Sequence, residues 1–146
     1  MKIKVFIENE AGSDQKNLFD EKALKYIRSV TVSRNYPFPY GFVLDTTSGD
    51  GDNLDCFILT NRKLKSEEVV EVEPIGLLEQ FENGTEDHNI IAVFDDEDIE
   101  FTDEIKGELT EFINGVFEHR KDMIVRVGIF FGAKEAMKLI EESQDT

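Results

Sequence analysis

The central stretch of the sequence is YPFPYGFVLDTTSGDGDNLD, which spans residues Tyr36 to Asp55. It ends in three closely spaced carboxylates, Asp50, Asp52 and Asp55, and glycines flank the first of them. Glycine allows the backbone to turn tightly and to approach a ligand closely. Like charges at this spacing repel one another unless a cation lies among them, and Mg²⁺ and Ca²⁺ prefer carboxylate oxygen. The stretch therefore indicates a turn that binds a divalent cation.

Two other interpretations compete with this one. A solvated surface turn is the commoner use of clustered acidic residues and is the simplest alternative. A calcium loop of the EF-hand type that began at Asp50 would need a polar ligand at position 54, glycine at position 55 and glutamate at position 61. The sequence has Leu54, Asp55 and Asn61 there, so the EF-hand interpretation fails.

Composition restricts the possible partners. The chain has 146 residues, 40% hydrophobic residues and 12 phenylalanines, which is enough for one domain, residues 1–146, with a substantial core. Its 32 acidic and 16 basic residues give a formal net charge of −16. This charge disfavours nucleic acid and anionic membrane surfaces as partners. It would also repel a polyanionic substrate unless metal ions reverse the local field.

The same features indicate the compartment. Cys56 is the only cysteine, so an internal disulfide is excluded, and its apolar neighbours predict a small core residue. No stretch reaches about 18 apolar residues, and the apolar part of the N-terminus is too short for a signal peptide. We therefore expect a cytoplasmic protein with no membrane partner.

Alternating apolar residues predict a strand at residues 2–8 and another at residues 24–32, with a polar loop at residues 9–20 between them. In the second strand, Arg28 shares a face with Val30 and Val32. Its stem could pack at a strand edge while the guanidinium reaches water. Alternatively, the guanidinium could face a cavity and bind phosphate, for which its planar fork is suited. The residues alone do not decide between these two interpretations.

The rest of the chain predicts further strands and then two helices. Strands are expected at residues 40–44, 55–60, 69–81 with a bend at Pro74 and Gly76, 89–94 and 123–131. Asn-Gly in residues 82–88 predicts a hairpin turn, and the acidic run 95–100 predicts a solvated connection. A helix should run from the N-cap Thr102 to about Glu118, and another over residues 133–142, with the last three residues frayed. Since the strands precede the helices without regular alternation, the fold class is α+β.

Several motifs together resemble the soluble family I inorganic pyrophosphatases. Tyr-Pro-x-x-Tyr-Gly-Phe at residues 36–42 is followed by Asp-Gly-Asp-x-Leu-Asp at residues 50–55. The resemblance continues in EPIGLL at residues 73–78, NIIAV at 89–93 and VFEHRKD at 116–122, and it covers about residues 5–140. It implies a small closed β-barrel of the OB type with two helices packed outside. It also implies hydrolysis of inorganic pyrophosphate to two phosphates by a homo-oligomer.

The resemblance implies a metal-binding role for several carboxylates. Asp50, Asp55 and Asp87 match the ligands of a tightly bound pair of Mg²⁺ ions, for which Mn²⁺ could substitute. Glu82 matches an aspartate that helps to bind a metal linked to the substrate. Glu8 matches a glutamate that lines the cavity and completes the implied metal-binding set.

Other positions match residues that act on the substrate. Asp52 matches the residue that orients or deprotonates the attacking water. Tyr36 matches a residue that supports the loop. The implied contacts with pyrophosphate are Lys16, Arg28, Tyr40, Arg120 and Lys121, of which Arg28, Tyr40 and Lys121 would also assist catalysis.

Some positions depart from the family pattern. Leu18 stands where the family has a glutamate, and Asn53 replaces the usual proline within the aspartate motif. Asn89 stands where a substrate-binding lysine is expected, and Arg120 where a phosphate-binding tyrosine is expected. The remaining departures are Pro39 for asparagine, Glu82 for aspartate and Asn83 for glutamate. These departures support an alternative function, a pyrophosphatase-fold protein that binds metal and phosphate or nucleotide but turns over poorly. A purely structural acidic barrel would leave the spacing of the three aspartates unexplained.

Overall fold

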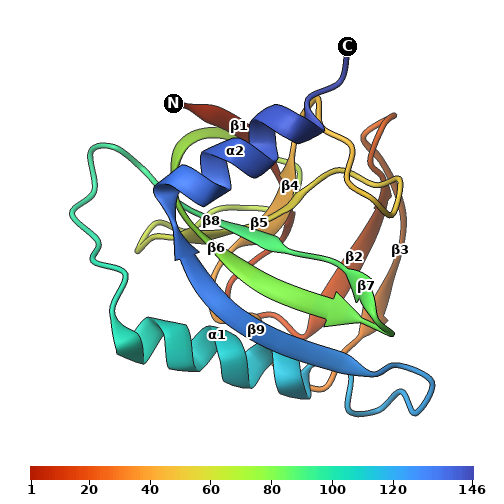
Figure 1. Cartoon of the computed structure of the whole chain (residues 1–146). Helices are drawn as coiled ribbons and strands as arrows, with labels where there is room; N and C mark the ends of the chain where they lie inside the picture. Colours follow the sequence, from red (N-terminus) through yellow and green to blue (C-terminus); the bar gives the residue numbers. More distant parts are fainter.

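A computed structural model describes all 146 residues. Its strands are β1 (Ile3–Asn9), β2 (Gln15–Asp20), β3 (Lys25–Thr31), β4 (Tyr40–Val43), β5 (Asp55–Leu59), β6 (Val69–Glu82), β7 (Thr85–Glu86), β8 (Asn89–Val93) and β9 (Val125–Gly132). Its helices are α1 (Asp103–Gly115) and α2 (Ala133–Ser143) (Figure 1). None of the helices is long and apolar enough to span a membrane.

Five strands form a closed ring. Strand β1 pairs antiparallel with β4 on one side and with β6 on the other, and the ring continues from β4 through β5 and β8 back to β6. Only β5 and β8 are parallel neighbours. The long strand β6 also pairs with β7 and β9, and its register shifts between Pro74 and Gly76, where a bend was predicted. The expected α+β fold with a small closed, OB-like barrel is therefore confirmed.

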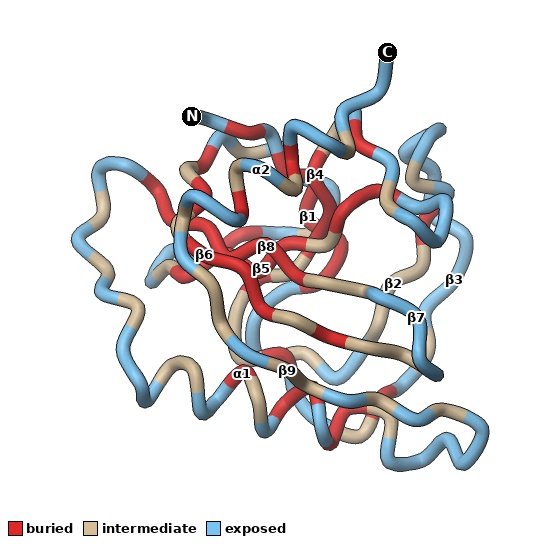
Figure 2. Tube along the Cα trace, in the orientation of Figure 1, coloured by how far each residue is buried: buried red, intermediate tan, exposed pale blue.

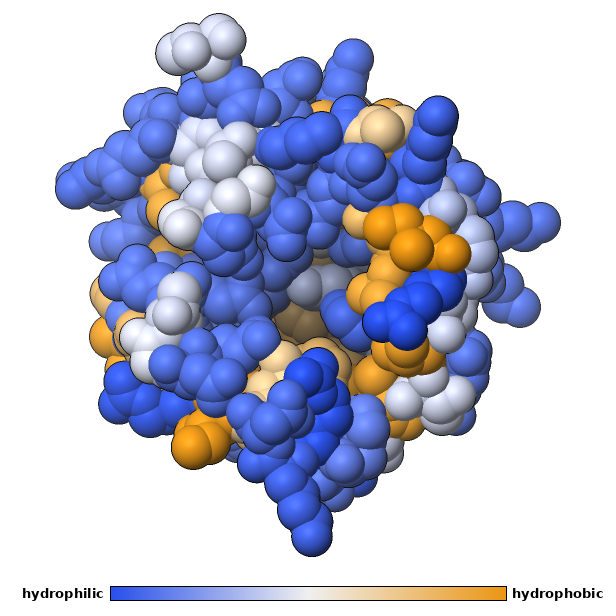
Figure 3. All heavy atoms as spheres, turned by 90° about the vertical axis from the view of Figure 1, so that its right-hand side faces the viewer, coloured by the Kyte–Doolittle hydropathy of each residue, from blue (hydrophilic) through white to orange (hydrophobic).

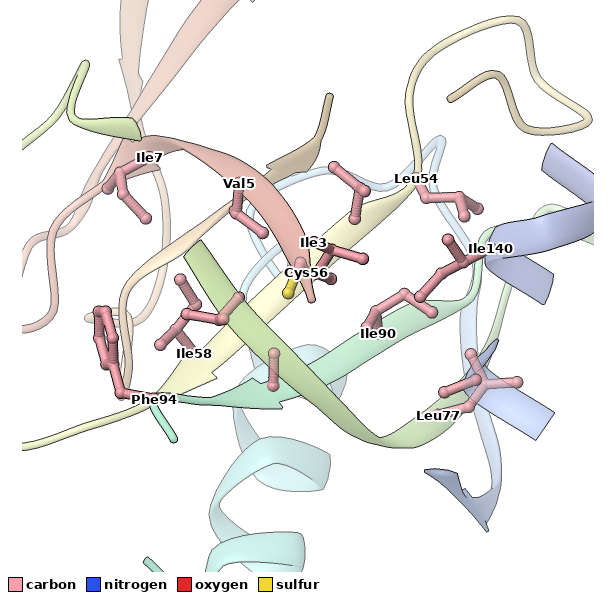
Figure 4. Packing of buried hydrophobic residues seen from close by; sticks show 14 of the residues in the cluster. Ile3, Val5, Ile7, Leu54, Cys56, Ile58, Leu77, Ile90, Phe94 and Ile140 are labelled. Atoms are coloured by element: carbon pink, nitrogen blue, oxygen red, sulfur yellow. The ribbon is translucent and has the colours of Figure 1, made fainter. Parts of the chain in front are cut away.

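The core lies inside the ring and beneath the two helices (Figure 2). Cys56, Ile58 and Ile90 are fully buried inside the ring, and Ile140 of α2 packs against the same cluster (Figure 4). Cys56 is thus the core residue that its apolar neighbours predicted. A second cluster joins Leu109 of α1 to the opposite faces of β5, β6 and β8. Both helices consequently lie outside the ring, as expected.

Strand β2 corrects the prediction of a polar loop over residues 9–20. Residues Gln15–Asp20 pair antiparallel with β3 and form a separate two-stranded sheet. The segment has little apolar alternation, so its strand character comes from pairing with β3 rather than from local pattern. Phe19 fixes the hairpin to the ring because its side chain packs edge-on against Phe6, with ring centroids 5.0 Å apart.

Helix α1 begins where the sequence predicted and ends earlier. The hydroxyl of Thr102 accepts a hydrogen bond from the backbone N–H of Ile105 at 3.2 Å, which is the expected N-cap. The helix ends at Gly115 instead of about Glu118. Beyond this point the carbonyl of Val116 accepts a hydrogen bond from the backbone N–H of Ser33 at 2.9 Å. This contact with the chain after β3 replaces a further helical turn.

The C-terminal residues correct another expectation. Gln144 forms an isolated β-bridge with Thr46 instead of fraying. The backbone N–H of Asp145 donates a hydrogen bond to the carbonyl of Asp45 at 2.9 Å, and its carboxylate accepts one from the hydroxyl of Thr47 at 2.6 Å. The chain end therefore holds the segment that leads into the acidic turn.

Candidate active site

A cavity of about 680 Å³ opens at one end of the ring, between the β2–β3 hairpin and the end of α1. The hollow is visible near the centre of the face drawn in Figure 3, where mainly hydrophilic residues surround it and an apolar patch lies beside it. Seven carboxylates line the cavity: Glu8, Glu21, Asp50, Asp52, Asp55, Glu82 and Asp87. Its lysine, arginine and tyrosine residues are Lys16, Arg28, Arg120, Tyr36 and Tyr40.

The sheet topology explains why distant carboxylates meet here. Asp55 is the first residue of β5 and Asn89 is the first residue of β8, and the two are register partners in the only parallel pair of the ring. Parallel neighbours begin at the same edge, so Asp87, two residues before β8, lies at the end of the ring where Asp55 begins β5. Glu8 lies near the end of β1, where the register pairs that strand with the start of β4, so Glu8 and Tyr40 line the cavity together.

The acidic turn is held by its own hydrogen bonds. The carboxylate of Asp50 accepts hydrogen bonds from the hydroxyl of Ser48 and, at 3.0 Å, from the backbone N–H of Asp52. The backbone N–H of Ser48 in turn donates to the carbonyl of Asp52 at 2.7 Å. Gly51 has φ +90°, a conformation that other residues rarely adopt. Asp52 itself is exposed, and its carboxylate lines the cavity without a hydrogen-bond partner.

The deeper carboxylates are poorly solvated. The Glu8 side chain is only 5% exposed and forms no hydrogen bond or ion pair. Burial raises the pKa of Glu8 to about 7, against an opposing effect of Lys16. Burial, followed by the charges of Asp87 and Glu8, raises the pKa of Asp55 well above its usual range. Burial and Asp87 also raise the pKa of Glu82. These groups favour protonation or a bound cation.

Glu21 is a cavity residue that the sequence analysis did not identify. It lies in the turn between β2 and β3, and one carboxylate oxygen accepts a hydrogen bond from the backbone N–H of Asn53 at 3.0 Å. Burial, then the charges of Glu8 and Asp52, raises its pKa to about 8. Its sequence signal is one acidic residue in a polar turn, and its partner is 32 positions away. No local pattern could have predicted this placement.

Lys16 supplies a cation at the cavity wall. Its ammonium lies 5.4 Å from the ring centroid of Tyr40 and 5.9 Å from that of Phe117. Burial by itself would lower the pKa of Lys16, but Tyr36, Glu8 and other acidic groups outweigh that effect and raise it. Burial also raises the pKa of Tyr40 well above its usual value, so the phenol stays protonated and can donate a hydrogen bond. Tyr36 is buried, in keeping with the supporting role implied for it.

The other three predicted cations differ in their positions. Arg28 lines the cavity from an exposed position on β3 and forms no ion pair. Arg120 also lines the cavity, but its guanidinium pairs with both carboxylate oxygens of Asp122, at 2.7 and 3.2 Å. Lys121 does not line this cavity. It lines an adjoining depression, which shares Phe117 and Arg120 with the cavity.

Two residues that depart from the family pattern, Asn89 and Leu18, line the cavity. Asn89 is buried, and its amide donates a hydrogen bond to the side-chain oxygen of Gln80 at 2.6 Å. The position where a lysine was expected therefore provides a neutral wall. Leu18 lines the cavity from β2, where a carboxylate was expected, and its register partner is Arg28.

The side chains that line the cavity have the donor atoms that a hard divalent cation prefers. The donors are carboxylate oxygens, which suit Mg²⁺ and Mn²⁺, and Glu8 is a buried carboxylate without a protein partner. No three acidic side chains converge into a ready-made coordination cluster. Binding would therefore require side chains around the cavity to rotate toward the ion.

Comparisons with known proteins agree with the fold. The family model described as inorganic pyrophosphatase matches residues 5–146. The chain belongs to this family. It is 32% identical over 159 residues to an inorganic pyrophosphatase of Nanoarchaeum equitans, covering 99% of this chain and 97% of the relative. It is 32% identical over 151 residues to that of Sulfolobus acidocaldarius, covering 95% and 87%.

Solved structures give the same result for the fold. The inorganic pyrophosphatase of Thermus thermophilus superposes with a TM-score of 0.86 at 27% identity, covering 97% of this chain and 88% of the other. The enzyme of Neisseria gonorrhoeae superposes with a TM-score of 0.89 at 25% identity, with the same two coverages. The resemblance inferred from the sequence motifs is confirmed.

Proposed function

We propose that this protein hydrolyses inorganic pyrophosphate to two phosphates with the help of Mg²⁺, for which Mn²⁺ could substitute. The observation that carries the proposal is the composition of the cavity at the end of the ring. It is lined both by carboxylates that could bind metal ions and by lysine and arginine residues that could bind phosphate. Membership of the inorganic pyrophosphatase family supports the same substrate.

The chemistry explains why both kinds of side chain are needed. The negative oxygens of pyrophosphate repel a nucleophile, and the leaving phosphate must accept charge. Divalent metals, when bound, supply charge neutralisation and lower the pKa of a bound water. The residues that would hold them are Glu8, Asp50, Asp55, Glu82 and Asp87. Since these carboxylates repel one another without a cation, metal binding should relieve that repulsion.

Asp52 is the proposed general base. Its carboxylate has no hydrogen-bond partner, lies at the cavity wall and is more exposed than Asp55. Burial and the charge of Asp50 raise its pKa, which makes it a better proton acceptor than an ordinary aspartate. These features suit a residue that orients and deprotonates water rather than one that serves mainly as a metal ligand.

Lys16, Arg28 and Tyr40 are proposed to bind the phosphate groups. Lys16 offers a half-buried charge, Arg28 a guanidinium without an ion-pair partner, and Tyr40 a protonated hydroxyl. Arg120 would contribute only after exchanging its contact with Asp122 for phosphate. Lys121 is omitted from this set because it lines the adjoining depression and not the cavity itself.

A weakly active binding protein is the second candidate function. Asn89 favours it, because a neutral amide bonded to Gln80 stands where the family motif has a lysine. Phosphate release from pyrophosphate, measured with Mg²⁺, with Mn²⁺ and with a chelator, separates the two functions. Release that requires metal supports the enzyme. Binding of metal and pyrophosphate without release supports the alternative.

A homo-oligomeric single domain is proposed as the working form. Large apolar side chains at Tyr26, Ile27, Ile124 and Ile129 are exposed, which supports association with a second copy. Light scattering coupled to size-exclusion chromatography tests this, because a monomeric mass would contradict it. Location in the cytoplasm stays a prediction.

A further inference from the structure

Glu21 connects two loops that are far apart in the sequence. It lies in the β2–β3 turn and is half-buried, and its Oε1 atom accepts the backbone N–H of Asn53 at 3.0 Å. Asn53 follows Asp52 directly in the acidic turn. The side chain of Glu21 therefore crosses from the hairpin to the aspartate motif, and it lines the same cavity as Asp50 and Asp52.

This contact depends on a departure from the family motif. Asn53 has a backbone N–H to donate, whereas the proline usual at this position would have none. Asn53 is also buried, and its side-chain amide donates to the carbonyl of Val43 at 2.9 Å, which fixes the donor in place. The residue that fixes Glu21 is thus one that distinguishes this sequence from the common pattern.

A second departure lies in the same hairpin. Leu18 lines the cavity from β2, where the family motif places a glutamate, so one carboxylate is missing from that strand. Glu21 lies only three positions further along and points into the same cavity. The hairpin therefore still contributes one carboxylate, but from its turn instead of its strand.

Glu21 is surrounded by negative charge that a bound cation would neutralise. Glu8, Asp50 and Asp52 are the acidic groups whose charges act on it, and it forms no ion pair with lysine or arginine. Only its Oε1 atom is hydrogen-bonded, so Oε2 remains free for another partner. Glu8, which is 5% exposed and has no hydrogen-bond or ion-pair partner of its own, is a second carboxylate of this cavity that a bound cation would stabilise.

We propose that Glu21 is an additional carboxylate of the metal site, replacing the one that is absent at position 18. One oxygen holds the aspartate motif through Asn53, and the other faces the cation in the cavity. The inference rests on the proposed function, since it assumes that the acidic cavity binds a divalent metal. A metal-binding role for Glu21 differs from a purely structural role. In a structural role the hydrogen bond to Asn53 would be enough to hold the two loops together, and the negative charge of Glu21 would not matter.

Calorimetric titration with Mg²⁺ separates these roles without requiring turnover. Glu21→Gln retains a carbonyl oxygen that can accept the Asn53 N–H but removes the charge. We expect its Mg²⁺ affinity to fall by at least about tenfold, while Glu10→Gln, an exposed carboxylate outside the cavity, keeps the wild-type affinity. The double variant Leu18→Glu/Glu21→Gln should recover most of the loss.

Each outcome decides the matter. Wild-type affinity in Glu21→Gln overturns the proposal, and a loss that the double variant does not recover overturns the replacement of position 18. If Glu21→Gln fails to fold, Leu18→Glu alone is the test. It should raise Mg²⁺ affinity by less than about twofold if Glu21 already supplies the carboxylate, and a tenfold rise overturns the proposal.

Phosphate release by the wild type is measured in parallel. Release by the wild type with unchanged affinity in Glu21→Gln rejects Glu21 and leaves the proposed function intact. Reduced affinity in Glu21→Gln without any release by the wild type rejects the function and leaves Glu21 as a metal-site residue.

Discussion

Asp52 and Asp55 lie three residues apart in the aspartate motif but have different surroundings. Asp55 begins β5, is partly buried, and its pKa rises through burial and the charge of Asp87. Asp52 is exposed, and its carboxylate has no hydrogen-bond partner. At the scale of single residues, this contrast separates a group suited to hold metal from a group suited to accept a proton.

Replacing Asp52 with asparagine should therefore reduce turnover more than metal binding. An amide cannot accept a proton, so kcat should fall by about 10²- to 10⁴-fold. Asp55→Asn should reduce Mg²⁺ affinity more strongly than Asp52→Asn does. Calorimetry and phosphate release on both variants make the comparison. Near-native turnover in Asp52→Asn, or equal loss of metal in the two variants, would show that this division of roles is wrong.

Arg28 gives a second prediction at this scale. Its guanidinium lines the cavity without an ion pair, so Arg28→Ala should change stability little. Loss of a charge-assisted contact with phosphate should cost about 1.5–3 kcal/mol, which is roughly 10- to 150-fold in kcat/KM. Lys25→Ala, an exposed cation on the same strand outside the cavity, is the control. Unfolding of Arg28→Ala with normal activity in the remaining folded fraction would make Arg28 structural.

At the scale of elements, β1 and β4 approach so closely that one position requires glycine. A Cβ atom on Gly41 would lie 1.9 Å from the carbonyl oxygen of Phe6. The two strands are adjacent in the ring and bring Glu8 and Tyr40 to the cavity. Any displacement of β4 from β1 therefore disturbs both the barrel and the site.

Gly41→Ala should accordingly destabilise the protein by about 1–3 kcal/mol. Gly107 in α1 is the matched control, because a Cβ there meets no atom within 4 Å and alanine is the better helix former. Gly107→Ala should raise the free energy of unfolding by about 0.5–1 kcal/mol. Urea denaturation measures both effects. Equal stability of the two variants would contradict the tight packing of β1 against β4.

The elements also show what could be predicted from the sequence. Apolar alternation located β1 and β3, Pro74 and Gly76 located the bend of β6, and Thr102 located the cap of α1. Each of these signals lies in residues that are close together in the chain. Strand β2 could not be predicted, since its polar sequence becomes a strand only by pairing with β3. Glu21 was missed for the same reason, because a backbone group 32 positions away holds it.

At the scale of the whole molecule, the net charge of −16 is concentrated in part around one cavity. Seven carboxylates line that cavity against three lysine or arginine residues. Their repulsion works against the compact fold unless protons or metal ions bind. The free energy of unfolding and the affinity for metal should therefore both depend on pH, because protons and metal ions bind the same carboxylates.

In the metal-free protein, the free energy of unfolding should fall as pH rises from about 4.5 to 8. Burial raises the pKa of Glu8 to about 7 and that of Glu21 to about 8, above the ordinary value of 4.5. The folded state thus binds more protons than the unfolded state in this window, and the stabilisation disappears as both groups ionise. Urea denaturation with excess chelator at several pH values measures the trend. A free energy of unfolding that rises across the window would contradict it.

Mg²⁺ should reverse that trend because it competes with protons for the same carboxylates. The rise in Tm caused by Mg²⁺ should reach several degrees near pH 8 and be smaller near pH 6. NaCl at the same ionic strength controls for general screening. Identical melting curves with Mg²⁺ and with chelator would contradict a metal site in the cavity.

Phosphate release from pyrophosphate, titrated with Mg²⁺, tests the central claim most directly. The wild type should release two phosphates per pyrophosphate, with a rate that rises with Mg²⁺, saturates, and disappears with chelator. Asp55→Asn should require more Mg²⁺ to reach its maximal rate. No release from the wild type at any Mg²⁺ concentration, while calorimetry detects binding of both metal and pyrophosphate, would contradict the proposed enzyme and favour the binding protein.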